Sequence, residues 1–264
     1  MTHTPTSYQL IHDPSDIIKF ATTFEVTNPN HCLIIQLLVR RKYHPQLSSA
    51  SLDIKTEIIK GGPNFIRDFH LALWRLETPL GSYFDAIKPL PNGCLSIYAR
   101  INPKDTTKAL ITAIPKCLAP LVSDQPIPNA LTIYKHEIIT TNAASDKKYY
   151  QLDIDTKDRD EISTINQLMK DNQINIIINI ETNKGFHTVV TFDKPKTKSS
   201  NKYKILHDFQ HSTSFTTTNI NGQTVKGYIL EIKKSDPNVI VPGTIHAGFP
   251  SRIISLDDWL QKKN

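Results

Sequence analysis

The sequence predicts an α/β (α+β) protein in which an N-terminal α/β module packs against a sheet of the split β-α-β kind. Three observations lead to this class. Strand-length apolar runs alternate with helical patterns in the first half of the chain, and a strand, a capped helix, a strand, a turn and a strand follow residue 148. The sequence contains no internal repeat, and no linker separates the two parts. We therefore expect one continuous two-lobed domain, with residues 1–145 as the N-terminal module and residues 146–264 as the second.

Apolar spacing predicts the elements of the first module, and a Gly61–Pro63 break interrupts a long helical region. One strand runs into Asn102–Pro103, after which Asp105 or Thr106 caps a helix. The other expected elements are a helix over Asp16–Phe24, a strand over His31–Val39, helices over Leu52–Ile59 and Phe65–Leu76, a strand over Cys94–Ile101 and a helix over Asn129–Ile139.

The second module has sharper local signals. Asp158 followed three residues later by Glu161 is a helix-capping signature, and a buried stripe follows at helical spacing. The five lysines within Asp193–Lys204 favour an exposed loop, which is either a solvated connector or a flap that binds a nucleic-acid backbone. The strands expected here are Tyr149–Asp155, Asn175–Ile180, Phe186–Phe192 after an Asn183–Gly185 turn, Val225–Ile232 after an Asn221–Gly222 turn, and an apolar run ending in Val241–Thr244.

The composition is that of a globular protein. Of 264 residues, 39% are hydrophobic and 21% are charged, and no segment approaches the ~18 consecutive apolar residues of a membrane span. The first residues lack the apolar stretch of a secretory signal, so we expect a cytoplasmic protein, or one associated with a nucleoid, a virus or a plasmid. Three widely spaced cysteines argue against a disulfide framework or zinc finger. The net charge of +6 weakly favours a polyanionic partner.

Asp153 and Asp155 are the first candidate site residues. Alternation along a strand places both carboxylates on one face, with Ile154 turned into the core. Their Cα atoms are then about 6.5–7 Å apart, which suits two divalent ions ~3.5–4 Å apart. The alternative is a pair of aspartates on the open face of an edge strand. Metal binding and phosphoryl transfer are therefore one of two interpretations.

A second candidate segment follows in the same sheet, at residues 182–187. Gly185 lets the backbone approach a ligand closely, while Lys184 and Thr182 offer a cation and a hydroxyl to phosphate oxygens. His187 shares a face with Val189, opposite to Phe186 and its partners on the strand. The alternative is an ordinary hairpin tip followed by a structural histidine.

These two segments resemble motifs of one known family. Tyr149–Asp155, YYQLDID, resembles the hydrophobic-D-x-D strand of the archaeo-eukaryotic primase superfamily, and Thr182–His187 resembles the small-residue, glycine and histidine motif of its prim-pol branch. Their order matches, and Ser96–Pro103 is similar to the strand that often precedes the metal motif. The likeness covers roughly Leu95 to Arg252 and implies the catalytic core of this superfamily, with its RNA-recognition-like sheet.

The resemblance also implies roles for individual residues. Asp153 and Asp155 hold the catalytic divalent ions, and His187, with Lys184 and Thr182, grips the phosphates of the incoming nucleotide. The family's third carboxylate is usually aspartate; here Glu231 is the first choice and Asp236 the reserve. Val239–Gly248 resembles a prim-pol stretch that adds two further nucleotide-binding residues, Thr244 and His246.

The expected activity is that of a primase–polymerase, which makes or extends primers on a single-stranded DNA or RNA template from nucleoside triphosphates. Hard oxygen ligands imply Mg²⁺ or Mn²⁺. Arg40, Arg41 and Lys42 close an apolar strand and are candidates for contacts with template phosphates. Two alternatives stay open: a non-catalytic module that binds single strands, and a metal-dependent nuclease that uses the same acids.

Overall fold

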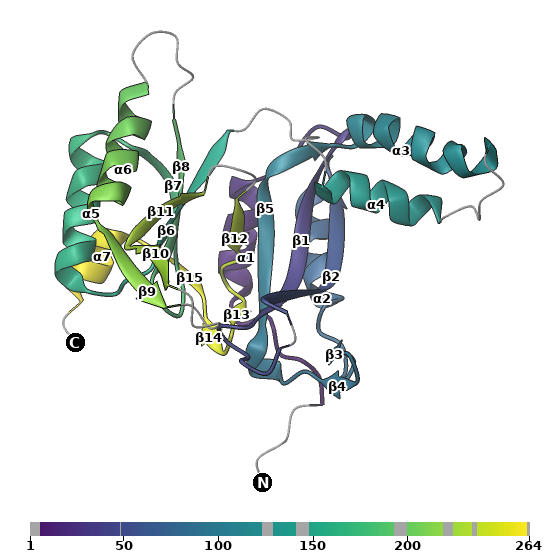
Figure 1. Cartoon of the computed structure of the whole chain (residues 1–264), viewed down its shortest axis with the longest axis horizontal. Coiled ribbons are helices and arrows are strands. Elements are labelled where there is room, and N and C mark those ends of the chain that lie inside the picture. The colour runs from purple at the N-terminus through teal and green to yellow at the C-terminus, as the bar shows by residue number, and fades with distance from the viewer. Residues whose placement is uncertain are drawn as a thin grey trace.

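The computed structural model describes residues 6–47, 49–122, 129–140, 148–192, 200–218, 224–233 and 237–262. These residues form a mixed α/β protein with seven α-helices and several antiparallel sheets, two of them large. Helices α5, α6 and α7 lie on one side of the second large sheet, and the first large sheet lies on its other side (Figure 1). The α/β class is therefore confirmed.

The first sheet has four antiparallel strands in the order β12-β5-β1-β2. These are β1 (His31–Arg40), β2 (Ser51–Lys60), β5 (Leu95–Asp105) and β12 (Asn238–Ile240). Helices α1 (Pro14–Thr23) and α2 (Phe65–Trp74) lie behind this sheet in Figure 1 and share its hydrophobic core. Asp13 begins α1 by accepting a 2.8 Å hydrogen bond from the N–H of Ser15.

The helix predicted over Leu52–Ile59 is wrong, because this segment is strand β2. It pairs antiparallel with β1 from Cys32↔Lys60 to Arg40↔Ser51, so backbone hydrogen bonding to β1 replaces the helical pattern. Ile54, Thr56 and Ile58 are β-branched residues that favour an extended chain. The Gly61 break therefore separates a strand from α2.

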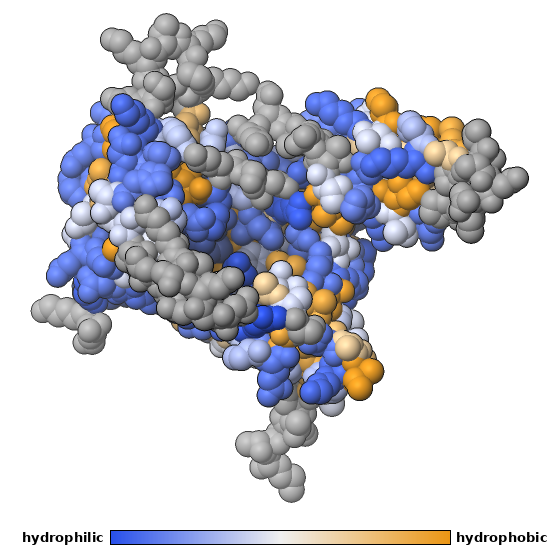
Figure 2. Space-filling view, viewed as in Figure 1, coloured by the Kyte–Doolittle hydropathy of each residue, from blue (hydrophilic) through white to orange (hydrophobic). Residues whose placement is uncertain are grey.

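Helices α3 (Thr106–Val122) and α4 (Ala130–Thr140) form a hairpin that projects from the first sheet (Figure 1). Of the two predicted caps, Asp105 and Thr106, Asp105 begins α3: its Oδ1 accepts hydrogen bonds from the N–H groups of Thr107 and Lys108. Apolar side chains gather on the outside of this hairpin (Figure 2). They are Leu110, Ile111, Ile114, Leu118 and Leu131.

The second sheet has five antiparallel strands in the order β11-β6-β8-β7-β15. These are β6 (Tyr149–Ile154), β7 (Asn175–Glu181), β8 (Phe186–Thr191), β11 (Leu230–Lys233) and β15 (Arg252–Ile254). Helix α5 (Arg159–Asp171) connects β6 to β7, so the predicted β-α-β-β succession is confirmed. Asp158 begins α5 as predicted, by accepting from the N–H groups of Asp160 and Glu161.

Helix α6 (Ser200–Ser212) lies partly within the segment predicted to be a basic loop. Residues 200–204 are helical, so the loop prediction is wrong there, and residues 193–199 lie outside the described part of the chain. Leu206 is fully buried against the second sheet, with Tyr203 and Phe209 packed beside it. Burial of this apolar side of α6 outweighs the lysine-rich composition. Helix α7 (Leu256–Gln261) packs on the same core.

The predicted strand Val225–Ile232 is divided in two. Its first part belongs to β10 (Thr224–Tyr228), which pairs with β9 (Ser214–Thr218), and its second part is β11, which pairs with β6. The turn predicted at Asn221–Gly222 lies outside the described residues. The remaining elements are short: β3 (Phe84–Asp85), β4 (Lys88–Pro89), the 3₁₀ turn Asn92–Cys94, β13 (Ile245–His246) and β14 (Phe249–Pro250).

The two halves of the sequence share elements and core. Strand β12 comes from the second half but pairs with β5 in the first sheet. Ile178, Ile180 and Val189 of the second sheet lie in the hydrophobic cluster built around the first. The boundary expected near residue 145 falls among residues 141–147, outside the described part, and stays a prediction. Among the described residues no helix is long and apolar enough to cross a membrane.

Candidate active site

Three polar side chains form a row across the second sheet. Glu231 of β11 pairs with Asp153 of β6, and Asp153 pairs with His187 of β8. Directly opposed residues of antiparallel strands project from the same face. Their neighbours Ile154 and Phe186 lie in the core beneath α5, α6 and α7, on the other face. The row therefore lies on the face opposite those helices.

His187 has a partner at each ring nitrogen. Its Nδ1 accepts a 3.2 Å hydrogen bond from the N–H of Ile240 in β12, which assigns the proton of the neutral ring to Nε2. Nε2 lies 3.4 Å from Oδ1 of Asp153, and the side chain is only 9% exposed. The structure thus brings the predicted imidazole and carboxylate together and fixes the ring between the two sheets.

Asp153 is held in its ionised form. Burial raises the pKa of its carboxyl, but the electrostatic interaction and hydrogen bond with His187, followed by the charges of Lys233 and Lys42, outweigh burial and lower the pKa to about 2. At neutral pH the row therefore contains a carboxylate that is only 20% exposed and surrounded by donors.

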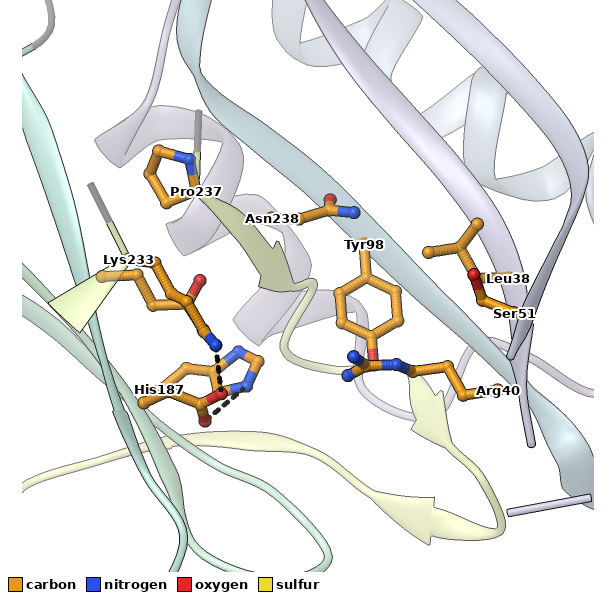
Figure 3. A pocket seen from close by; sticks show the side chains of 10 residues that line it. Leu38, Arg40, Ser51, Tyr98, His187, Lys233, Pro237 and Asn238 are labelled. Atoms are coloured by element: carbon orange, nitrogen blue, oxygen red, sulfur yellow. Dashed lines mark ion pairs between the residues drawn. The ribbon is translucent and has the colours of Figure 1, made fainter. Parts of the chain in front are cut away.

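Lys233 interacts with both carboxylates of the row. Its Nζ lies 3.9 Å from Oδ2 of Asp153 and forms an ion pair with Oε2 of Glu231. Residues two apart on a strand share a face, so β11 presents Lys233 beside Glu231. Figure 3 shows the ammonium pointing at the carboxylate that also contacts His187. Two carboxylates thus already converge on one cation.

The first sheet supplies the opposite wall. Tyr98 of β5 is buried, and its hydroxyl lies 3.3 Å from Nε2 of His246 and hydrogen bonds with Arg40 of β1. Burial raises the pKa of Tyr98 to about 12, although the charge of Arg40 lowers it, so the hydroxyl stays protonated. Figure 3 shows Arg40 and Tyr98 facing Lys233 and His187 across the gap.

His246 is a neutral part of this wall. Burial, followed by the charges of His187, Lys42 and Arg40, lowers its pKa to about 3. Its ring lies edge-on to Tyr43, with centroids 5.1 Å apart. The Nδ1 atom is buried without a hydrogen-bond partner among the described residues.

A cavity of about 310 Å³ lies between the two walls. This volume is at the lower end of the roughly 300–1,000 Å³ of small-molecule pockets. The cations Arg40 and Lys233 and the ionised Asp153 all line it. The lining residues are Leu38, Arg40, Ser51, Tyr98, Gln151, Asp153, His187, Lys233, Pro237 and Asn238.

Asp155 and Lys42 lie near the cavity without lining it. Strand β6 ends at Ile154, one residue earlier than predicted, and the N–H of Asp155 donates to Ile229 O at 3.0 Å. Burial and the charge of Arg40 lower the pKa of Lys42, while Asp155 and then Asp153 raise it. Both aspartates are therefore within electrostatic reach of the basic end of β1.

The donor set suits a divalent ion only in part. Carboxylate oxygens are the ligands that Mg²⁺ and Mn²⁺ prefer, and those of Asp153 and Glu231 converge on a cation, the Lys233 ammonium. The described residues contain no group of three or more His, Cys, Asp or Glu side chains arranged to hold a metal. Since Mg²⁺ at phosphoryl-transfer sites is commonly held by one or two carboxylates plus substrate phosphates, the residues present fit an ion that arrives with a phosphate ligand.

No match joins this chain to a known protein. Protein-family models, curated proteins and solved structures were all compared with it, and none matches. The resemblance to the primase superfamily therefore stays a prediction, and the site is interpreted from its own geometry.

The predicted phosphate-binding turn lies at one end of the row. Thr182 is buried, and its Oγ1 accepts from the N–H of Gly185 at 3.2 Å while its own N–H donates to Gly185 O at 2.9 Å. A Cβ on Gly185 would lie 1.8 Å from Ile154 O, so glycine is required by the close approach of β6. Lys184 is exposed at the tip. This hairpin is thus held by its own hydrogen bonds.

The other predicted residues lie in different surroundings. Thr244 is fully buried and donates to Val241 O at 2.6 Å, within the turn after β12. The Arg41 guanidinium donates from Nε to the carbonyl oxygens of Leu47 and Ser49, so it stabilises the β1–β2 connection and is not directed into the cavity. The reserve ligand Asp236 lies outside the described residues.

Seven of the ten residues that line the cavity were not predicted as site residues from the sequence, among them Tyr98, Lys233 and Asn238. Lys233 could have been predicted, because it stands two residues after Glu231 on the same strand face. Asn238 could not have been predicted in this way, since it joins the site only through the pairing of β12 with β5, and no local pattern shows that Tyr98 of β5 faces the cavity.

Proposed function

We propose that the cavity binds a nucleoside triphosphate with Mg²⁺ or Mn²⁺, and that the protein is a metal-dependent nucleotidyltransferase of the primase–polymerase type. The observation that carries this proposal is the row of Glu231, Asp153 and His187, in which Asp153 and His187 line one cavity opposite Arg40. Phosphoryl transfer depends mainly on positioning and on neutralising phosphate charge, and this cavity combines carboxylates for an ion with cations for phosphate oxygens.

The strand order of the second sheet supports the same proposal. Along the chain the elements of this sheet follow the order β6-α5-β7-β8-α6-β11, with the β9-β10 hairpin inserted between α6 and β11. Without that insertion this is the β-α-β-β-α-β succession of RNA-recognition-like sheets. The primase resemblance implies a sheet of this kind with its paired acids on the first strand. Asp153 lies on that strand.

The side chains divide into three roles. Arg40 binds phosphate oxygens, for which its planar guanidinium offers two parallel donors, and Lys42 adds positive charge beside the cavity. Asp153 and Glu231 hold the divalent ion, which supplies charge neutralisation at the triphosphate when bound. Because both ring nitrogens of His187 already have partners, we assign His187 to orienting Asp153.

The reaction proposed is extension of a primer on a single-stranded DNA or RNA template. The terminal 3′-hydroxyl attacks the α-phosphorus, a phosphodiester bond forms, the bond between the α- and β-phosphates breaks, and pyrophosphate and a proton leave. The protein holds the 3′-hydroxyl, the α-phosphorus and the leaving pyrophosphate in line and prevents other arrangements of these groups.

The test is incorporation of a labelled nucleotide on a primed template with Mg²⁺ or Mn²⁺. Asp153→Asn keeps an oxygen that accepts from His187 but removes the charge, so we expect native folding and incorporation reduced by more than about 100-fold. Asp171→Asn, an exposed change on α5 where the carboxylate accepts from Gln167, is the matched control and should keep full activity. Equal incorporation by wild type and Asp153→Asn would rule out this active site.

One observation favours a second candidate, a module that binds single-stranded nucleic acid without catalysis. Lys233 already neutralises both Asp153 and Glu231, as expected of a site that no longer takes a metal. In that case oligonucleotide binding should weaken with salt, ignore Mn²⁺ and occur without incorporation. Shortened oligonucleotides in the same assay would instead indicate a nuclease.

A further inference from the structure

We propose that His207 and His211 of α6 form a binding site for a transition-metal ion such as Zn²⁺, Ni²⁺ or Cu²⁺, separate from the cavity. The two residues are four apart in a helix and therefore lie on one face, one turn apart. Their Nε2 atoms are 3.1 Å apart, and their ring centroids are 4.3 Å apart. Both ligating atoms thus point at a common position.

The separation of the two nitrogens suits a shared ion. Two nitrogen ligands, each about 2.0–2.1 Å from one ion, are about 3.4 Å apart at a tetrahedral angle and about 2.9 Å apart at a right angle. The observed 3.1 Å lies between these values. The same distance allows one ring to donate a hydrogen bond to the other, which holds the rings in this orientation in the metal-free protein. An ion would then replace the shared proton with little movement of either ring.

The other ring nitrogen of His207 has a carboxylate nearby. Asp208 Oδ1 lies 3.8 Å from Nδ1 of His207, on the side of the ring away from the paired nitrogens. Metal-binding histidines commonly have a carboxylate at the second nitrogen, which orients the ring and strengthens it as a ligand. The rings of Tyr203 and Tyr228 flank the pair, each with its centroid 6.0 Å from that of the adjacent histidine. Nε2 is therefore the atom through which each ring would bind the ion, in place of the hydrogen bond between the rings.

The position is open to solvent and incomplete. The His207 side chain is 37% exposed, and His211 is exposed. No third His, Cys, Asp or Glu of the described segments completes a ligand set, so water or a ligand from another molecule fills the other positions. Imidazole pairs favour Zn²⁺, Ni²⁺ and Cu²⁺, whereas Mg²⁺ and Mn²⁺ prefer carboxylates. This preference separates the site on α6 from the carboxylate row in the cavity.

An ion at this site would also stabilise the contact of α6 with the second sheet. Chelation across one turn favours the helical state of residues 207–211. Gln210 lies between the two histidines, and its Oε1 accepts a 3.0 Å hydrogen bond from the N–H of Ile232 in β11. Strand β11 carries Glu231 and Lys233. The ion would therefore stabilise the helix that supports one edge of the cavity.

Thermal unfolding of the full, untagged chain with NiCl₂, and with MgCl₂ as the comparison ion, tests the proposal. A ligand that binds the native state raises the Tm, so we expect a saturable increase with Ni²⁺ and none with Mg²⁺ at the same concentration. Equilibrium dialysis should give one Ni²⁺ per chain. His207→Ala and His211→Ala should each weaken binding at least about tenfold.

His136→Ala is the matched control, since His136 is an exposed histidine on α4 with threonines one turn away at Thr132 and Thr140. It should bind Ni²⁺ as wild type does. If the alanine variants do not fold, His207→Gln and His211→Gln keep polar, helix-favouring side chains and should lose binding equally. Retained stoichiometry in the histidine variants, or no binding by wild type, would overturn the proposal. Because no nucleotide is present, the result is independent of the proposed transferase activity.

Discussion

At the scale of single residues, the Lys233 ammonium determines how strongly the carboxylate row binds a metal ion, because it already neutralises these carboxylates. The Lys233 ammonium lies where Asp153 and Glu231 attract positive charge, so a divalent ion must compete with it. In Lys233→Gln the two carboxylates lose their counter-charge. We therefore expect Mn²⁺ binding without nucleotide to tighten by about tenfold, a discounted effect because both Lys233 and Glu231 are more than a third exposed.

Electron paramagnetic resonance of free Mn²⁺ measures this binding directly. Lys170→Gln is the control, because it removes a lysine that forms a 2.6 Å ion pair with Asp257 at a distance from the row. Its Mn²⁺ affinity should match wild type. An unchanged affinity in Lys233→Gln would show that the ammonium does not occupy the metal position.

Asp153 also links the row to the pH dependence of stability. Its pKa in the folded protein, about 2, is below the ordinary value of 3.8, so the ionised form stabilises the fold above about pH 4 and this contribution is lost as the pH falls toward 2. The difference corresponds to roughly 2 kcal/mol. Urea unfolding at pH 5 and at pH 2.5 should therefore show a larger loss for wild type than for Asp153→Asn. Equal losses would mean that the contacts with His187 and Lys233 do not stabilise the carboxylate.

At the scale of elements, the hairpin between β7 and β8 is set by one close approach. The Cβ of an alanine at position 185 would lie 1.8 Å from the carbonyl oxygen of Ile154, which is backbone and cannot rotate away. Gly185→Ala should separate β8 from the end of β6 and reduce the free energy of unfolding by about 1–3 kcal/mol or more. Gly93→Ala is the control, because its Cβ would meet no atom within 4 Å. Chemical denaturation measures both, and similar values for the two variants would contradict this account of the turn.

The same elements show how far the sequence determines structure. Local sequence signals correctly predicted the helix starts at Asp158 and Asp105, where hydrogen bonds between residues close in sequence fix the structure. They also predicted the face of the strand on which His187 lies, because side chains alternate along a strand. They failed for Leu52–Ile59, whose conformation is fixed by pairing with β1, and for the start of α6, which is fixed by burial of Leu206. Both conformations depend on residues that are distant in sequence, and the intrinsic helix or strand preference of a segment carries no information about such residues.

The residues of the candidate site also fall into two groups, those that local sequence signals predict and those that long-range strand pairing brings in. Asp153 and His187 lie on strands joined within one local unit, so their meeting followed from alternation along neighbouring strands. Asn238 is brought to the cavity by β12, a strand from the end of the chain that joins the first sheet beside Tyr98 of β5. The pairing of β12 with β5 joins residues about 140 positions apart, and the hydrophobic periodicity of neither segment indicates it.

At the scale of the whole molecule, the two large sheets depend on each other. Ile178, Ile180 and Val189 of the second sheet are buried in the core of the first, and β12 crosses back to pair with β5. His187 is held by β12 as well, through the N–H of Ile240. We therefore expect the full chain to unfold in one cooperative transition, with near-ultraviolet circular dichroism and tryptophan fluorescence changing together.

A fragment of residues 146–264 tests this dependence. Separated from the first sheet it exposes Ile178, Ile180 and Val189 to water and leaves β12 without its partner strand, and together these form an apolar face of the kind that causes aggregation. We expect the fragment to bind the dye ANS strongly and to unfold without cooperativity, while the full chain does neither. Adding residues 1–145 in trans should suppress dye binding, because β5 then regains β12 and the shared core re-forms. A fragment that folds cooperatively alone would instead mean that the second sheet is an autonomous domain and that the cavity lies between two independent bodies.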